Sequence, residues 1–375
     1  MSDVLLFDPR GTFSALDRDL ISRHREYISA AREESSGVLD RLVVLTFVTG
    51  STRQIYSDGS ILIVGLNSLS WLCLSLGIDF KIWQVLPEID PKVISCSDPW
   101  LSYLFGAIYQ RQVSKKAKPI RVQLQIHGEF FSKQWKSGLK QIIKSRAARI
   151  SINKADQIRC VSESLRQELI ELDFAPQEKV VVAPVPITLS NRVGTIPSNL
   201  PRTIGFVGRI QPERGLEIFC GLAKRIYKVD PTIKLVIVGD GGSRKAFEEL
   251  LEESFPKNQI EFTGHLSSEE LENAWERIGI LVSTAPSESY GRSLREALMH
   301  GVPVWSTDTR GLRDLIQEYP SGAIRKIVLD NSEAEIIEDL TYLFSQKRDF
   351  GYRYQYEITR SSIVAEIGSF WARLL

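Results

Sequence analysis

Short apolar runs alternate with polar, helix-compatible stretches along most of the chain. In the first half these runs occupy residues 4–7, 41–47, 61–64, 80–86, 93–96, 120–126, 156–162 and 179–185. The alternation restarts later with runs at 203–208, 233–242, 259–264, 279–284 and 301–306. Short apolar strands that alternate with helices are typical of βαβ units around a parallel sheet. The pattern therefore predicts an α/β protein with two doubly wound, Rossmann-like domains.

A change of composition marks the boundary between the two domains. The stretch NRVGTIPSNLPR, at 191–202, is rich in proline, glycine, serine and asparagine, which favours a linker. We therefore predict a first domain over 1–190 and a second over 203–347. The aromatic-rich tail predicts a final helix at about 350–375 that docks on a domain, with the first domain as one option. Two such domains imply a cleft, with ligands at the carboxyl ends of the strands.

One uncharged segment, residues 59–78, is long enough to span a membrane. Its glycines, its serines and Asn67 instead favour a short buried strand followed by a helix. The start of the chain, MSDVLLFDPR, lacks the basic region of a signal peptide. The four cysteines are scattered and have no zinc-like spacing, which is typical of reduced core residues. These features predict a cytoplasmic protein.

Charge is unevenly distributed, although the whole chain carries only +1. Residues 101–160 contain 13 lysines and arginines against 2 acidic residues, a net of +11, and the remainder carries −10. This asymmetry indicates a surface that meets something anionic. Composition is otherwise that of a globular protein, with 43% hydrophobic and 25% charged residues.

Two arginines follow the first strand of the second domain, in the stretch GRIQPERG. Arg209 comes directly after the strand, and Arg214 lies near a helix start that Pro212 favours. A helix N-terminus with guanidinium groups beside it is suited to a phosphate. A surface ion pair with Glu213 or Glu217 is the alternative.

Two glutamates flank a predicted helix start in the stretch SESYGRSLREALMHGVPV, Ser287 to Val304. We predict a helix that begins near residue 290 or 291, with exposed N–H groups as a second anion cradle. Glu296 is placed to accept from a ribose diol, and Glu288 from a group beyond the phosphates. The alternative is a helical ion pair of a glutamate with Arg292 or Arg295.

The combined motifs resemble the nucleotide-binding half of the group 1 family of retaining GT-B glycosyltransferases. GRIQPERG, VGDGG, FTGHL and APSESYGRSLREALMHGVPV follow the family's order and spacing over residues 203–315. The first half resembles the family more loosely, through QIHGEF, an SDP before a helix at 97–99, and the stretch from 155 to 163.

The resemblance implies a GT-B fold, in which two Rossmann-like domains face a central cleft, and it implies site residues. The catalytic group would be His127, facing the donor sugar, Arg209 and Arg214 on the diphosphate, and Glu288 on the transferred sugar. The donor-binding group would comprise Gly11, Ser289, Tyr290, Gly291, Arg292, Ser293 and Glu296. His265 and His300 are interpreted as structural.

Three departures from the family pattern concern the site. Arg214 replaces the usual lysine at the phosphate, so charge is kept and bidentate reach is added. The N-terminal glycine-rich loop is reduced to PRGTFS, in which Gly11 is the only glycine, so the acceptor side is expected to be unusual. PVPI, at 184–187, replaces an expected Asn-Gly-Val-Asp, for which we have no functional account.

The expected reaction is glycosyl transfer from a nucleoside diphosphate sugar to a hydroxyl of a glycan or lipid-linked acceptor. Positive charge would stabilise the departing diphosphate. Retention is implied by the family alone, and no paired-carboxylate arrangement supports a hydrolase. No cofactor or metal is expected, because the only DxD motif, Asp17 to Asp19, lies in a predicted helix. Nucleic acid is not an expected partner, because no nucleic-acid motif accompanies the basic charge.

A basic amphipathic stretch follows His127. Apolar residues form one stripe and basic residues form another, which suits an anionic membrane surface and equally a core-packed helix with a solvated lysine face. The family resemblance favours the membrane surface, because members that act on lipid-linked acceptors often dock in this way. The expected membrane-surface residues are Lys133, Trp135, Lys136, Lys140 and Lys144. The prediction is thus a peripheral enzyme of surface polysaccharide or glycolipid biosynthesis. The alternatives are a catalytically silent nucleotide-sugar-binding protein and a cytosolic transferase that makes a soluble glycoside.

Overall fold

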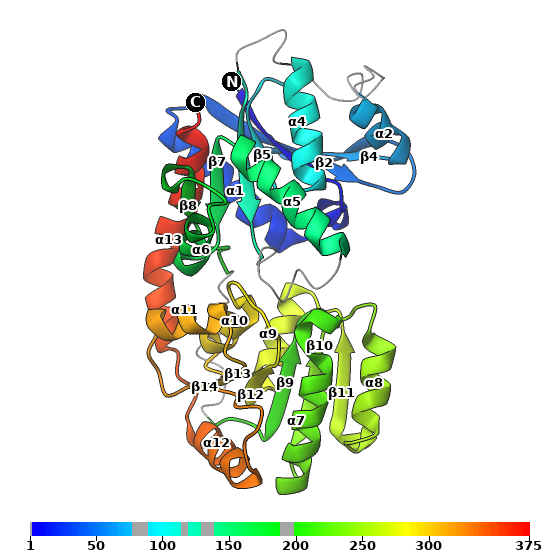
Figure 1. Ribbon diagram of the computed structural model, residues 1–375, viewed down its shortest axis with the longest axis vertical. Helices are drawn as coiled ribbons and strands as arrows, with labels where there is room; N and C mark the ends of the chain where they lie inside the picture. The colour runs from blue at the N-terminus through cyan, green and yellow to red at the C-terminus, as the bar shows by residue number, and fades with distance from the viewer. Residues whose placement is uncertain (1, 77–88, 114–118, 129–138, 188–198) are drawn as a thin grey trace. The chain divides into compact units, whose positions relative to one another are not determined.

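The chain forms two compact units, shown in the computed structural model of Figure 1, which describes residues 2–76, 89–113, 119–128, 139–187 and 199–375. Unit 1 comprises residues 1–188 and 360–375, and unit 2 comprises residues 189–359. Each unit has its own sheet, with helices packed against it. Most of the predicted linker, and the apolar run at 80–86, lie outside the described residues.

The sheet of unit 1, within the described ranges, has eight strands in the order β3-β4-β2-β1-β5-β6-β7-β8. The neighbours are parallel, except that β3 runs antiparallel to β4. The strands are β1 (Ser2–Asp8), β2 (Leu39–Phe47), β3 (Arg53–Ser57), β4 (Ile61–Leu66), β5 (Pro91–Cys96), β6 (Arg121–Ile126), β7 (Gln157–Cys160) and β8 (Val180–Val182).

Helices cover the faces of this sheet, which explains the continuous apolar runs of its central strands. All residues of β1 are buried, as expected where a parallel strand is covered on both faces. The helices of unit 1 are α1 (Arg18–Glu34), α2 (Ser68–Leu76), α4 (Leu101–Val113), α5 (Leu139–Lys154) and α6 (Glu163–Glu171). The uncharged segment at 59–78 therefore contains β4 and α2, in agreement with the strand–helix interpretation. None of the described helices is both long and apolar enough to cross a membrane.

The sheet of unit 2 is wholly parallel over the described residues, in the order β11-β10-β9-β12-β13-β14. Its strands are β9 (Thr203–Val207), β10 (Lys234–Val238), β11 (Ile260–Gly264), β12 (Ile280–Ser283), β13 (Val304–Ser306) and β14 (Ile324–Lys326). Its helices are α7 (Leu216–Val229), α8 (Arg244–Glu252), α9 (Ser268–Glu276), α10 (Arg292–Met299), α11 (Arg310–Glu318) and α12 (Glu333–Ser345). Phe206, Phe219 and Phe247 pack at centroid distances of 5.4–5.8 Å and tie β9 to α7 and α8.

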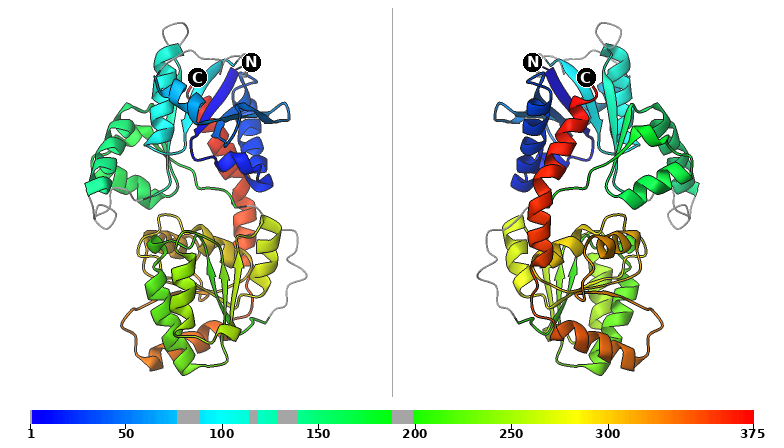
Figure 2. Two further views of the ribbon diagram at one scale, coloured as in Figure 1. Left: turned by 90° about the vertical axis from the view of Figure 1, so that its right-hand side faces the viewer. Right: turned by 90° about the vertical axis from the view of Figure 1, so that its left-hand side faces the viewer.

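The last helix, α13 (Gly351–Ala372), begins in unit 2 and ends in unit 1. Its final turns lie beside α1 in both views of Figure 2, and Trp371 contacts Tyr27 of α1 at a centroid distance of 6.3 Å. Arg360 also pairs with Glu26 of α1 at 2.8 Å. The indole Nε1 of Trp371 donates to Gln123 Oε1 at 2.9 Å, inside the core of unit 1. The C-terminal segment is therefore part of the first core.

We expect Trp371→Ala to lower the free energy of unfolding of unit 1 by about 3–5 kcal/mol. The reason is that a side chain only 1% exposed is lost and the amide of Gln123 loses its donor. Tyr354→Ala is the matched control, because this aromatic residue of the same helix is 60% exposed. Urea unfolding followed by circular dichroism measures both, and equal effects would contradict the docking described here.

Candidate active site

The loop that follows β9 carries both arginines predicted to bind phosphate. Arg209 is 72% exposed, and its guanidinium lies 3.8 Å from Glu213, so the alternative surface pair is present in the structure. Arg214 ends a short 3-10 helix that begins at Pro212. Gly215 follows with a φ of 67°, and a Cβ there would lie 2.0 Å from the Thr284 carbonyl oxygen. Only glycine fits where this loop crosses the end of β12.

Arg214 forms an ion pair with Glu288, which comes from the loop after β12. The two side chains are 27% and 18% exposed, so the pair is partly shielded from water. Its Nη1 donates to Glu288 Oε2, whereas Nε is enclosed without a hydrogen-bond partner. The guanidinium is thus oriented by one carboxylate and keeps donor capacity for another anion.

The N-terminus of α10 lies at the end of the same β12 loop. Gly291 precedes the helix with a φ of 70° and provides no side-chain cap, which agrees with the predicted helix start. The first N–H groups of a helix have no intrahelical acceptor, and together with the helix dipole they favour an anion. Glu296 lies one turn further on and pairs with Arg292 at 2.7 Å, so this alternative pair also forms. Ser293, in the first turn, is exposed in part.

Two of the predicted donor-binding residues are enclosed within unit 2. Ser289 is 6% exposed and Tyr290 is 7% exposed. The guanidinium of Arg295 lies 4.0 Å from the centroid of the Tyr290 ring, donates to the Tyr290 carbonyl oxygen, and pairs with Glu318 at 2.6 Å. The ring therefore packs inside unit 2 against Arg295, so only the backbone groups of Tyr290 are placed to contact a ligand.

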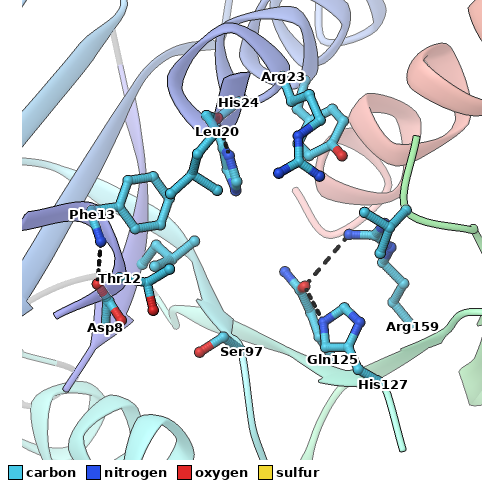
Figure 3. A pocket seen from close by; sticks show the side chains of 13 residues that line it. Asp8, Thr12, Phe13, Leu20, Arg23, His24, Ser97, Gln125, His127 and Arg159 are labelled. Carbon is cyan, nitrogen blue, oxygen red and sulfur yellow. Dashed lines mark hydrogen bonds between the residues drawn. The ribbon is translucent and has the colours of Figure 1, made fainter. Parts of the chain in front are cut away.

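Unit 1 contains a cavity of about 190 Å³ at the carboxyl ends of its central strands. Figure 3 shows side chains entering it from α1, from the loop after β1, and from the ends of β5, β6 and β7. The residues that line it are Leu6, Asp8, Thr12, Phe13, Leu20, Arg23, His24, Tyr27, Ser97, Gln125, His127, Arg159 and Val185. Gly11 precedes two of these residues in the shortened PRGTFS loop.

His127 follows β6 and lies at this cavity, with its ring partly open to solvent. Its Nε2 is 3.1 Å from Gln125 Oε1, and Gln125 in turn donates to Ser95 Oγ at 2.9 Å. Desolvation, and then the positive charge of Arg159, lower the pKa of His127, so the imidazole is neutral at pH 7. A neutral imidazole positioned by an amide can exchange hydrogen bonds with a sugar hydroxyl.

The sequence analysis did not identify the cavity's other charged and titratable groups. Arg159 lies on β7, is 3% exposed, and donates to the carbonyl oxygens of Ala183 and Pro184. Arg23 and His24 enter from α1 (Figure 3). A charged residue in the buried strand DQIRCVS is a signal that could have revealed Arg159, whereas α1 gave no comparable signal.

The remaining predicted residues that the structure describes belong neither to the two loops of unit 2 nor to the cavity lining. Lys133, Trp135 and Lys136 lie outside the described residues. Lys140 and Lys144 lie on α5, and the Lys144 ammonium is 5.3 Å from the centroid of the Trp100 ring. His300 is buried, stacks on Trp275, and approaches the Glu296 carbonyl oxygen at 2.8 Å. Among the described residues, no group of three or more His, Cys, Asp or Glu side chains could hold a metal ion.

Comparison with known proteins identifies the class to which the fold and the loop motifs belong. Residues 194–353 match the model of the family "Glycosyl transferases group 1", and residues 43–191 match that of "Glycosyltransferase Family 4". Two solved structures share the fold over nearly all of both chains. A sucrose-phosphate synthase from Thermosynechococcus elongatus aligns with a TM-score of 0.72 at 15% identity, over 100% of this chain and 99% of that one. HepE of Anabaena, in complex with UDP and glucose, aligns with a TM-score of 0.64 at 14% identity. That alignment covers 99% of this chain and 95% of HepE.

The chain is a GT-B protein of the group 1 glycosyltransferase family, as its motifs indicated. A curated relative, the GDP-mannose-dependent alpha-mannosyltransferase of Corynebacterium glutamicum, is 33% identical over 132 residues. That alignment covers 35% of this chain and 29% of the relative. The chain thus matches about a third of the length of this relative and of the similar mannosyltransferases from mycobacteria.

We expect the stability of unit 1 to fall between pH 7 and pH 5 because of His24. Burial lowers the pKa of His24 from 6.5 to about 3, although its Nδ1 lies 2.8 Å from the Leu20 carbonyl oxygen. Below pH 6.5 the unfolded chain therefore binds a proton that the folded chain excludes, which costs up to about 1.4 kcal/mol per pH unit.

Urea unfolding at pH 7, 6 and 5 measures this dependence in the wild type and in His24→Gln. The variant should lose about 2 kcal/mol less than the wild type over this range. His265→Gln is the control, because His265 is exposed in a turn. Parallel pH profiles for all three proteins would show that His24 is not held neutral.

Proposed function

We propose that the protein is an enzyme that transfers a sugar from a nucleoside diphosphate sugar to an acceptor hydroxyl, with retention at the anomeric carbon. The observation that carries the proposal is the ion pair of Arg214 with Glu288, a residue of the loop that leads into the N-terminus of α10. Membership of the group 1 family supports the same activity. The two solved structures are 15% and 14% identical to this chain, so they support the fold, and the proposed chemistry rests on the site and the family.

The roles follow from charge and position in unit 2. Arg209, Arg214 and the first N–H groups of α10 would bind the diphosphate. Negative charge grows on that group as the glycosidic bond breaks, and fixed donors stabilise it without reorganisation. Glu296 would accept from the ribose hydroxyls. Glu288 would accept from the transferred sugar while Arg214 turns its unused N–H groups toward phosphate.

In unit 1, His127 would contact the donor sugar, as the family resemblance implies. Its neutral state and its contact with Gln125 support this role, because a neutral, oriented imidazole can exchange hydrogen bonds with a sugar hydroxyl. One relative's name specifies GDP-mannose, whereas the Anabaena structure contains UDP and glucose, so the two point to different donors.

A thermal-shift panel of UDP, GDP and ADP, with their glucose, mannose, galactose and N-acetylglucosamine forms, tests donor binding. One base should raise Tm, because a ligand specific to the folded state stabilises it. Arg214→Met should lower the affinity for that ligand by roughly 10–100-fold, because a hydrogen bond to a charged group contributes about 1.5–3 kcal/mol. Arg214→Lys should retain most of the affinity, since charge is preserved.

The matched control is Arg277→Met, which removes an exposed arginine that pairs with Glu261 ahead of β12. Affinity should be unchanged in this variant. A panel in which no nucleotide raises Tm would contradict the proposal. Binding without turnover against any acceptor would instead favour a catalytically silent nucleotide-sugar-binding protein.

The second part of the proposal places the acceptor at an anionic membrane surface. On α5, Leu139, Ile142, Ile143 and Ile150 are 38–74% exposed. The helix has several basic residues and no acidic one. The Trp100 indole donates to the Lys144 carbonyl oxygen, which brings the start of α4, with exposed Leu101 and Leu104, beside α5. Apolar side chains flanked by basic residues suit an anionic bilayer.

Cosedimentation with vesicles of phosphatidylglycerol and phosphatidylcholine tests this surface. The double variant Leu139→Gln/Ile143→Gln should lose at least about 10-fold in binding, because each buried aliphatic side chain contributes about 1.5–3 kcal/mol. Val328→Gln/Leu329→Gln removes two residues of unit 2 that are 58% and 53% exposed, and it should bind normally. Equal binding by all three proteins would favour a transferase that makes a soluble glycoside.

A further inference from the structure

The cavity of unit 1 contains a buried cation for which the described residues supply no counterion. Arg159 is 3% exposed, and no described carboxylate lies within 4.0 Å of its guanidinium. Its donors are directed to neutral oxygens, at 3.0 Å from Ala183 O, 3.0 Å from Pro184 O and 3.5 Å from Gln125 Oε1. A guanidinium does not lose its charge in proteins, so burial at this position leaves net positive charge.

A second guanidinium enters the same cavity from α1. Arg23 is 8% exposed, and its Nε is enclosed without a hydrogen-bond partner. The carboxylate of Asp19 lies 3.6 Å from that Nε, which is an ion pair but too long for a hydrogen bond. Arg23 and Arg159 also each lower the pKa of His24, so both charges are felt inside the cavity.

The remaining lining groups do not neutralise the pair. Asp8 is the only carboxylate among the described lining residues. One of its oxygens accepts from the backbone N–H of Phe13 at 2.8 Å and from Thr46 Oγ1 at 2.7 Å. His24 and His127 are neutral at pH 7. Because Asp19 pairs with Arg23, Arg159 is the guanidinium of this lining that has no described carboxylate within 4.0 Å.

We propose that Arg23 and Arg159 bind an oxyanion, a phosphate or a carboxylate, carried by the acceptor. This inference rests on the proposed function, which assigns the diphosphate of the donor to unit 2 and so leaves the cavity of unit 1 available to the acceptor. Guanidinium groups recognise such oxyanions through paired N–H donors, and an anion would supply the counterion that the cavity lacks.

The shape and the other walls of the cavity define the rest of the ligand. A volume of about 190 Å³ is below the 300–1,000 Å³ of sites that enclose a drug-sized ligand, so one charged end of the acceptor fits. Thr12 and Ser97 present hydroxyl groups, and Phe13 and Tyr27 present aromatic rings. This lining suits a hydroxylated carbon frame, such as a sugar or polyol, that carries the anion.

Inorganic phosphate is the minimal probe, added to the full chain at an ionic strength held constant with sodium chloride. We expect phosphate to raise Tm in the wild type. Phosphate could also bind beside Arg214, so the same titration is made in Arg214→Gln. The rise should persist in Arg214→Gln and disappear in Arg23→Gln, with apparent Kd weakened at least about 10-fold.

The matched control is Arg18→Gln, which removes an exposed arginine from the same helix. Arg23→Gln is chosen over Arg159→Gln because Arg159 also holds the backbone of Ala183 and Pro184. Arg159→Lys is the second variant, since it keeps one charge and loses the paired donors. Arg159→Lys should lower the affinity for phosphate by less than Arg23→Gln does. The Tm of Arg159→Lys without ligand reports whether the variant is folded.

Glucose 6-phosphate, glucuronate and glucose then separate the possible ligands. If only glucose 6-phosphate raises Tm, the site is specific for a phosphate ester. If glucose 6-phosphate and glucuronate both raise Tm, the site accepts oxyanions in general. Each of these results supports the proposal. Equal responses to glucose and to both anionic sugars would overturn it. A phosphate response that survives in Arg23→Gln and is lost in Arg214→Gln would overturn it as well.

The nucleotide titrations distinguish this inference from the proposed function. Nucleotide binding that depends on Arg214, without an anion response that depends on Arg23, would leave a transferase whose acceptor is uncharged at this cavity. An anion response that depends on Arg23, without any nucleotide binding, would leave the anion site and remove the transferase.

Discussion

The ion pair between Arg214 and Glu288 is the contact on which the proposed donor site depends. The two residues are 74 positions apart, and the parallel order of β9 and β12 brings the loops after these strands to one edge of the sheet. Gly215 permits the close approach, because its Cα passes the Thr284 carbonyl oxygen where any side chain would collide. The sheet order, one glycine and one ion pair together hold a guanidinium at the loop that leads into α10.

The two units differ in how the arginines of their candidate sites are paired. In unit 2 the guanidinium already has a carboxylate, whereas in unit 1 Arg159 and Arg23 are enclosed with incomplete compensation. Burying charge without a partner is costly, and proteins retain such groups where a ligand supplies the missing partner. The neutral His127 fits this setting, since it adds hydrogen-bonding capacity without further positive charge.

Much of the fold could be predicted because apolar runs of four to seven residues are a strong signal for covered parallel strands. β1 and β10 are examples, and their runs are nearly uninterrupted. β3 was missed because its residues, RQIYS, are partly exposed at the edge of the sheet and lack the apolar pattern. β14 was missed because its three residues, IRK, include two basic side chains and form no apolar run.

The site was predictable only where it is local in sequence. The glycine and the glutamates around α10 lie in one stretch, so their spacing shows a helix start with carboxylates on either side. Glu288 pairs with Arg214 across two loops, and no local pattern specifies that contact. Arg23 and His24 come from α1 and meet Arg159 only through the sheet, so the cavity became visible only when the chain was folded.

The most direct test of the account is release of nucleoside diphosphate from a sugar nucleotide in the presence of an acceptor. The full chain should release it from donors of one base, and more rapidly with acceptor than without. Arg214→Met should lower kcat/KM by about 100-fold or more, since the leaving group loses a preorganised donor. Release by the wild type no faster than by Arg214→Met, for every donor and acceptor, would contradict the assignment of the unit 2 loops as a transferase site.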